Sequence, residues 1–143
     1  MATRDKRDPV LLVDTSVAVA LTVSDHEHHE ATIAASTGRR LGLAGHAAFE
    51  TFSVLTRLPP PVRRTPATVA HLLQSNFPHS RFLSPDACAA LLATLHASGI
   101  AGGAIYDALV GATAAEHDLV LATRDRRALD TYRKLDAALQ LIA

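Results

Sequence analysis

Short apolar runs alternate along the chain with longer segments that have helical spacing. Runs bounded by polar residues or glycine are typical of strands buried on both faces of a parallel sheet. The predicted strands are 10–13, 41–44, 81–83, 119–122 and 139–142, and the predicted helices are 16–21, 28–36, 47–58, 66–75, 85–99, 104–117 and 126–132. Strands alternating with helices predict an α/β fold, a three-layer α/β/α sandwich with a central parallel sheet.

The length and composition narrow the class of protein. The 143 residues predict a single domain, with residues 1–9 as a flexible N-terminal extension. Hydrophobic residues are 48% and charged residues 20%, a globular composition. No stretch approaches the roughly 20 apolar residues of a membrane span. The charged start lacks the apolar segment of a signal peptide. We therefore expect no membrane association and a cytoplasmic location.

The single cysteine and the charge balance argue against a disulfide-bonded protein and against a strongly basic nucleic-acid-binding protein. Cys88 has no cysteine to pair with, which excludes an internal disulfide and fits a reducing compartment. Its apolar helical surroundings predict a buried, inert thiol. The net charge is zero, so no global basic field indicates nucleic acid, although arginines cluster at several places.

An aspartate closes the first predicted strand. Asp14 follows the run Val10–Val13 and precedes Thr15 and Ser16. It has two interpretations: an N-cap of the next helix, or a site residue at the sheet edge where ligands bind in open α/β folds. Because a lone buried carboxylate is costly, the choice depends on whether other carboxylates reach the same edge.

Three further carboxylates are predicted near that edge. Glu50 lies in the first turns of the helix after the second strand, and Asp125 follows the strand that ends near Thr123. Asp107 lies early in the segment GGAIYDALVGATAAEHD, in an unusually apolar setting for a charge. Gly102 and Gly103, just before it, predict a tight turn.

Four carboxylates at one edge would repel each other unless a cation were present. Mg²⁺ and Mn²⁺ prefer oxygen ligands and keep several waters. Ions held at an open acidic site can lower the pKa of a water molecule and stabilise a leaving oxygen. The pattern therefore favours metal-dependent hydrolysis of phosphodiesters.

Four segments together resemble the successive motifs of PIN-domain ribonucleases, in particular VapC-type toxins: VDTSVAVAL, HAAFETFSVLTRLPPP, GIAGGAIYDALVGATAAEHD and LATRDRRAL. The resemblance runs from Leu11 to Ile142, with the motifs in order. It implies that Asp14, Glu50, Asp107 and Asp125 form a catalytic, metal-binding cluster for Mg²⁺ or Mn²⁺, supported by Ser16 and Thr123. It also implies RNA cleavage, a homodimer and neutralisation by a VapB-type antitoxin.

Other classes of protein also gather acids at strand ends. A receiver domain needs a lysine late in the chain at a strand end, and neither Lys6 nor Lys134 is so placed. A haloacid-dehalogenase-like phosphatase would have an aspartate where this chain has Ser16. A PIN-like domain that has become a catalytically silent binding or regulatory module remains the alternative.

Three arginines lie beside the last motif. Arg124, Arg126 and Arg127 precede or begin a helix, where cations oppose the helix dipole, so helix stability does not explain them. They are candidates for binding RNA phosphates, and contacts with acids such as Asp130 or Asp136 are the alternative.

The histidines indicate a functional site less clearly than the carboxylates do. The segment HEHHE at 26–30 could suggest zinc, but its position at an exposed helix start favours ordinary surface polarity. His46 is expected to cap the helix that carries Glu50.

Overall fold

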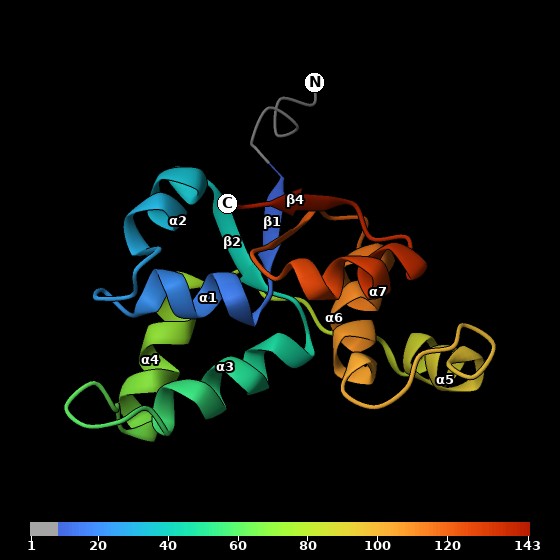
Figure 1. The fold of residues 1–143 in the computed structure, drawn as a ribbon, viewed down its shortest axis with the longest axis horizontal. Helices are drawn as coiled ribbons and strands as arrows, with labels where there is room; N and C mark the ends of the chain where they lie inside the picture. The colour runs from blue at the N-terminus through green and yellow to red at the C-terminus, as the bar shows by residue number, and fades with distance from the viewer. Residues whose placement is uncertain (1–8) are drawn as a thin grey trace.

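A parallel sheet forms the centre of the protein. The computed structural model describes residues 9–143, and its strands there have the order β2-β1-β3-β4 (Figure 1). They are β1 (Val10–Val13), β2 (Arg40–Leu43), β3 (Leu121–Thr123) and β4 (Leu139–Leu141), all parallel. Leu12 lies opposite Gly42 on one side and Leu121 on the other. The expected extension at residues 1–8 lies outside the described residues.

Helices cover both faces of this sheet. They are α1 (Thr15–Thr22), α2 (His29–Ser36), α3 (His46–Thr56), α4 (Pro66–Asn76), α5 (Pro85–Thr94), α6 (Ala104–Glu116), the 3-10 turn η2 (Arg126–Ala128) and α7 (Leu129–Lys134). Side chains alternate along β1: Leu12 packs with Val110 of α6, whereas Leu11 packs with Val17 of α1. Because both faces are buried, the strand is apolar throughout. The predicted three-layer α/β/α sandwich is confirmed.

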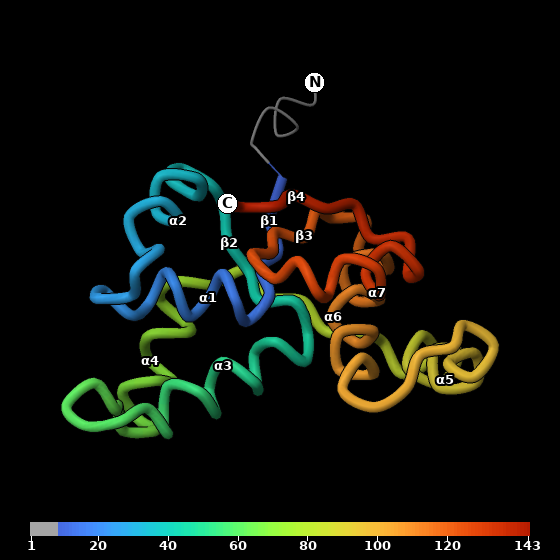
Figure 2. Tube along the Cα trace, viewed as in Figure 1, coloured from blue at the N-terminus to red at the C-terminus, as the bar shows by residue number. Residues whose placement is uncertain are grey.

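The chain leaves the parallel strands at one edge of the sheet. Figure 2 shows α1 and α3 starting just below the sheet, where β1 and β2 end. The segment after β3 starts from the same edge, because β3 is parallel to β1. This edge collects the first turns of α1 and α3 and the residues after Thr123, which is where we expect a site in an open α/β sheet.

The predicted strand at 81–83 is wrong. Arg81 forms only an isolated bridge with Ala44. Along this edge of β2, the Leu43 N–H donates to the side-chain hydroxyl of Ser80 at 2.9 Å, so a side chain replaces the backbone acceptor that a strand would offer. Ser84 then caps α5 by accepting from the Ala87 N–H at 3.1 Å.

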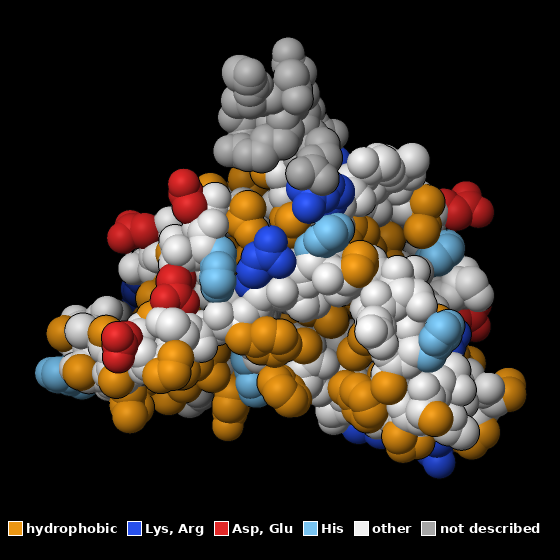
Figure 3. Space-filling view, turned by 180° about the vertical axis from the view of Figure 1, so that it is seen from behind, with side chains coloured by type: hydrophobic (Ala, Val, Ile, Leu, Met, Phe, Trp, Pro, Cys, Tyr) orange, Lys and Arg blue, Asp and Glu red, His pale blue; other side chains and the backbone are white. Residues whose placement is uncertain are grey.

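Cys88 is exposed, so the prediction of a buried thiol is wrong. Helix α5 packs against α6, and its outward side carries apolar side chains, including Leu92, whose exposed fraction is 74%. Cys88 and Leu92 line an apolar groove with Ile105 and Leu109 of α6. Seen from behind, hydrophobic side chains gather along the lower edge of the molecule (Figure 3). A helical apolar pattern does not show which of its residues meet the core.

In residues 9–143, every helix is too short or too polar to cross a membrane.

Candidate active site

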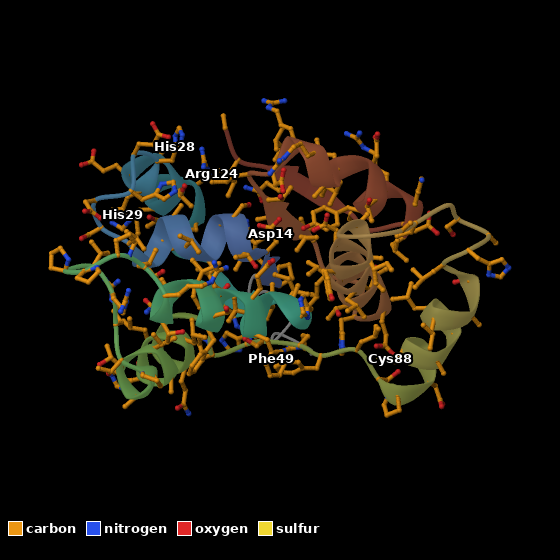
Figure 4. All side chains as sticks on the ribbon, turned by 60° about the horizontal axis from the view of Figure 1, so that its bottom comes forward. Asp14, His28, His29, Phe49, Cys88 and Arg124 are labelled. Atoms are coloured by element: carbon orange, nitrogen blue, oxygen red, sulfur yellow. The ribbon has the colours of Figure 1, made fainter. Side chains whose placement is uncertain are left out.

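Asp14 lies at the end of β1, and each of its two carboxylate oxygens accepts two hydrogen bonds. Its side chain accepts from Ser16 Oγ at 2.6 Å and the Val17 N–H at 3.2 Å through Oδ1. Through Oδ2 it accepts from Thr123 Oγ1 at 2.5 Å and Tyr132 Oη at 2.8 Å. The residue is 4% exposed, and burial raises its pKa above the ordinary value of 3.8 although these bonds oppose the rise. Asp14 is therefore both a helix cap and a buried site carboxylate (Figure 4).

Ser16 and Thr123 connect this carboxylate to the loop after β3. The Ser16 hydroxyl also accepts from the Arg124 N–H at 2.8 Å, and the Thr123 hydroxyl accepts from the Asp125 N–H at 3.0 Å. Each hydroxyl thus donates to Asp14 and accepts from the backbone of that loop. The structure brings together the predicted supporting residues and Asp14; their role in catalysis stays a prediction.

Glu50 approaches the same edge from α3. Its Oε1 accepts a hydrogen bond from the hydroxyl of Thr15, the first residue of α1. Glu50 is itself exposed. Sequence reasoning did not assign Thr15 a role, because a threonine beside an N-cap is ordinary at a helix start. The contact fixes one carboxylate oxygen of Glu50 and leaves the residue facing solvent.

The negative charges of the other three acids all act on the carboxyl group of Asp107. Its pKa is raised to about 6, first by partial burial in the first turn of α6 and then by the charges of Asp125, Glu50 and Asp14, in that order. The Arg127 cation offsets part of this rise. All four predicted carboxylates therefore interact electrostatically. The turn before α6 has Gly102 at φ +60°, as the predicted tight turn requires.

Asp125 caps the 3-10 turn after β3. Its Oδ1 accepts from the Arg127 N–H at 3.0 Å, and the Arg127 Nε lies 3.5 Å from the same oxygen. The Arg127 side chain is 95% exposed, so this ion pair is screened by water. Asp130, expected as a possible partner for these arginines, lies instead 3.7 Å from Arg133.

The three predicted RNA-binding arginines lie in different settings. Arg126 and Arg127 are exposed on η2. Arg124 lies on the α2 side of Asp14, towards His28, and its Nε is buried without a hydrogen-bond partner among the described residues (Figure 4). Of the three, Arg126 and Arg127 have side chains that a phosphate could reach from solvent, and Arg127 is at the same time paired with Asp125. RNA contact by any of them stays a prediction.

Tyr132, like Thr15, contacts the site and was not predicted from the sequence. It lies on α7, 118 positions from Asp14, and is 2% exposed. Nothing in the local sequence LDTYRK indicates that this tyrosine reaches the end of the first strand. Only its position, on the helix that follows Asp125 and on the side that faces the sheet, could have indicated a contact with the site.

The predicted role of His46 is wrong. Gly45 is the N-cap of α3, and His46 is the first helical residue, with no side-chain cap. Its ring stacks on that of Tyr106, with centroids 4.9 Å apart. In the segment HEHHE, His29 Nδ1 lies 2.7 Å from the backbone oxygen of Ala20, so one ring nitrogen is already used by α1.

The acidic cluster fits a hard divalent cation in its chemistry. Its donors are carboxylate and hydroxyl oxygens. Burial raises the pKa of Asp107 most, and the repulsion from Asp125, Glu50 and Asp14 that adds to this rise is what a cation would relieve. In residues 9–143 no three acidic, histidine or cysteine side chains are grouped closely enough to enclose an ion by themselves. Mg²⁺ commonly binds through one or two carboxylates and retains water, so wide spacing suits it.

Comparisons with known proteins agree with this architecture. The family model of the PIN domain matches residues 11–134. "Ribonuclease VapC27" of Mycobacterium tuberculosis (strain H37Rv) is 49% identical over 127 residues, covering 89% of this chain and 93% of the relative. "Ribonuclease VapC40" of Mycobacterium tuberculosis (strain CDC 1551) is 46% identical over 131 residues, covering 90% and 96%.

Two solved structures share the fold. VapBC2 from Rickettsia felis, bound to a DNA fragment from its promoter, matches with a TM-score of 0.66 at 12% identity, covering 93% of this chain and 98% of the other. FitAcB from Neisseria gonorrhoeae matches with a TM-score of 0.63 at 20% identity, covering 90% and 95%. The family model and the close relatives together show that this chain belongs to the PIN domain family, among its VapC-type members.

Proposed function

We propose that the protein is a Mg²⁺- or Mn²⁺-dependent endoribonuclease that acts as a toxin. The observation that carries the proposal is the approach of four carboxylates from four chain segments to one edge of the sheet, where burial and then the charges of the other three acids raise the pKa of Asp107 to about 6. The substrate class comes from relatives that are named ribonucleases and are 46–49% identical to this chain.

Asp14, Glu50, Asp107 and Asp125 are the residues that would hold the cation. When bound, the cation supplies charge neutralisation at the phosphate and a lowered pKa for an attacking water. Asp14 is held in place by its four donors, and Glu50 by Thr15. Arg126 and Arg127 would hold phosphates of the RNA strand.

The direct test is cleavage of a panel of structured RNAs with Mg²⁺, with Mn²⁺ and with EDTA. We expect cleavage with either metal, none with EDTA, and almost none for Asp107→Asn in any condition. Activity that persists unchanged in EDTA would contradict the metal-dependent mechanism. Sequencing the RNA ends produced after expression in cells then identifies the target and the bond that is cut.

The resemblance to VapC toxins and to VapBC2 supports neutralisation by a VapB-type antitoxin. We propose that a basic residue of the antitoxin enters the acidic cluster and displaces the cation. The loop at 59–61, which follows α3, could shape a groove for the antitoxin segment. Titration of the purified antitoxin should abolish cleavage at saturation, and full activity in the saturated complex would contradict occlusion.

A homodimer is also proposed, from the same family resemblance. The exposed apolar groove between α5 and α6 supports it, since Leu92 is 74% exposed beside Cys88 and Leu109. Light scattering coupled to size-exclusion chromatography should give a dimer for the wild type and a monomer for Leu92→Asp. A monomeric wild type would refute the dimer, and a dimeric Leu92→Asp would move it to another face.

The alternative is a catalytically silent PIN-like binding module. It predicts RNA binding without cleavage at any metal concentration, with equal RNA affinity for the wild type and Asp107→Asn. The cleavage panel and a binding isotherm on the same RNAs separate the two functions.

A further inference from the structure

Tyr132 is a buried phenol with its hydroxyl on the central carboxylate of the site. Its Oη donates to Asp14 Oδ2 at 2.8 Å, and the residue is 2% exposed. Helix α7, which carries it, packs against α6, which carries Asp107 (Figure 1). Tyr132 therefore connects one acidic residue of the cluster to the helix that packs beside another.

The ring of Tyr132 is fixed by close packing on α6. A Cβ built on Gly111 would lie 3.2 Å from Tyr132 Cδ1 and 3.4 Å from its Cα. Glycine at 111 thus lets the ring and backbone of Tyr132 approach α6 closely, in the core cluster that includes Leu12 and Val110. A ring held in this way has a hydroxyl oxygen that cannot move away from Asp14 without repacking the core.

The other two hydroxyl donors to Asp14 are on short side chains that also contact the loop after β3. Ser16 and Thr123 have short side chains whose hydroxyls can turn about one bond, and both also accept from backbone N–H groups of the loop after β3. A carboxylate has about four lone-pair positions, and Asp14 uses four. A cation that approaches Asp14 therefore meets a carboxylate whose two oxygens are already oriented by four donors, and of the three hydroxyl donors Tyr132 is the one on a ring held by close packing against Gly111.

We propose that Tyr132 is a positioning residue for the metal site, whose hydroxyl fixes Oδ2 of Asp14 and thereby sets the orientation of that carboxylate towards Asp107. This rests on the proposed metal-dependent function. Removing the hydroxyl leaves a buried oxygen with one donor fewer and 4% exposure to water, so the ionised form is less favourable and its orientation less defined. Partners that orient ligating groups in this way typically contribute 10–100-fold to metal affinity or activity.

The test compares Tyr132→Phe with Tyr106→Phe as the matched control. The chain has two tyrosines and no tryptophan, and Tyr106 is 54% exposed and stacked on His46. Free Mn²⁺ is measured by electron paramagnetic resonance during titration of the purified, RNA-free protein. We expect the Mn²⁺ dissociation constant of Tyr132→Phe to rise about tenfold or more, and that of Tyr106→Phe to stay at the wild-type value.

Tyr106→Phe also leaves Tyr132 as the sole tyrosine. Its fluorescence should change during a Mg²⁺ titration and saturate, because the charge on its hydrogen-bonded carboxylate changes. In cleavage assays Tyr132→Phe should keep the wild-type KM for RNA, lose rate at limiting Mn²⁺ and recover it at saturating Mn²⁺. A role in stability alone would lower the melting temperature without this rescue by metal.

The outcomes separate the two proposals. Wild-type Mn²⁺ affinity in a folded Tyr132→Phe overturns the positioning role and leaves the proposed nuclease intact. Absence of Mn²⁺ binding by the wild type overturns both. Weaker Mn²⁺ binding by Tyr132→Phe in a protein that cuts no RNA supports the positioning role and overturns the proposed nuclease.

Discussion

Thr123 donates a hydrogen bond to Asp14 across 109 positions of the chain and ties the ends of β3 and β1 together at 2.5 Å. Both residues are buried, and the same hydroxyl accepts from the Asp125 N–H. The Thr123 side chain thus contacts the carboxylate of Asp14 and the backbone of Asp125. Its position at the end of a central strand makes it part of the fold and of the site together.

Thr123→Val should therefore lower both the stability of the fold and the affinity of the site for metal. It keeps the shape but leaves the buried carboxylate of Asp14 without one donor and the Asp125 N–H without its acceptor, which costs about 1–3 kcal/mol for an unsatisfied buried group. Urea unfolding at pH 7 measures this loss, and Mn²⁺ titration should show weaker binding. Thr123→Ser, which keeps the hydroxyl, is the control and should stay near the wild type in both.

The strand-end acids were predictable because parallel strands end at a common edge. Asp14 and Asp125 directly follow strands, and Glu50 lies one turn into the helix after β2, so the order of elements suffices to bring them together. Asp107 was predicted from its apolar setting early in a helix, and its role as a metal ligand is what the resemblance to PIN domains implies. The local pattern also gave the helix cap at Asp14 as one of its two interpretations, because one side chain decides the geometry of a cap.

The remaining parts of the site depend on tertiary packing. Tyr132 contacts Asp14 only because α7 folds back against α6, and no local spacing indicates such a contact. His46 lies beside Tyr106 because α3 and α6 start close together, so its ring stacks there and does not cap the helix. Cys88 is exposed because α5 buries only its side towards α6.

Asp107→Asn should stabilise the metal-free protein above pH 6 and have little effect near pH 4. In the unfolded chain Asp107 loses its proton near 3.8, whereas in the folded protein its pKa is about 6. Between these values the folded state binds the extra proton, so wild-type stability falls as pH rises, and the loss is complete above the folded pKa. Asparagine does not titrate, so Asp107→Asn does not undergo this loss of stability.

Thermal melts in EDTA at pH 4, 5, 6 and 7.5 would show the difference in melting temperature between Asp107→Asn and the wild type growing through this window. A difference that does not change with pH would mean that repulsion at Asp107 does not limit stability. Asp130→Asn on the exposed surface of α7 is the control for loss of one carboxylate.

Metal binding should stabilise the wild type more at pH 7.5 than at pH 5. A cation that binds only the folded state adds about 2.7 kcal/mol at 100 times its dissociation constant. Below the Asp107 pKa of about 6, a proton competes with the cation for that carboxylate, so the apparent affinity falls. Melts with and without Mn²⁺ at both pH values measure this. An equal Mn²⁺ effect in Asp107→Asn would show that the ion binds elsewhere.

Arg126→Ala should weaken RNA binding and leave Mn²⁺ affinity unchanged. Arg126 is exposed on η2 and directly follows Asp125 in the chain, so its cation is a candidate for binding a phosphate near the acidic cluster. Removing one cation that neutralises a phosphate of single-stranded RNA reduces the slope of log affinity against log salt by about 0.7. Binding isotherms at several salt concentrations, with Asp107→Asn in the background to prevent cleavage, give that slope. Arg133→Ala, which removes the same charge from α7 where it faces Asp130, should keep the original slope. If Arg126→Ala and Arg133→Ala gave the same slope, the weaker binding would reflect net charge alone and Arg126 would not contact the RNA.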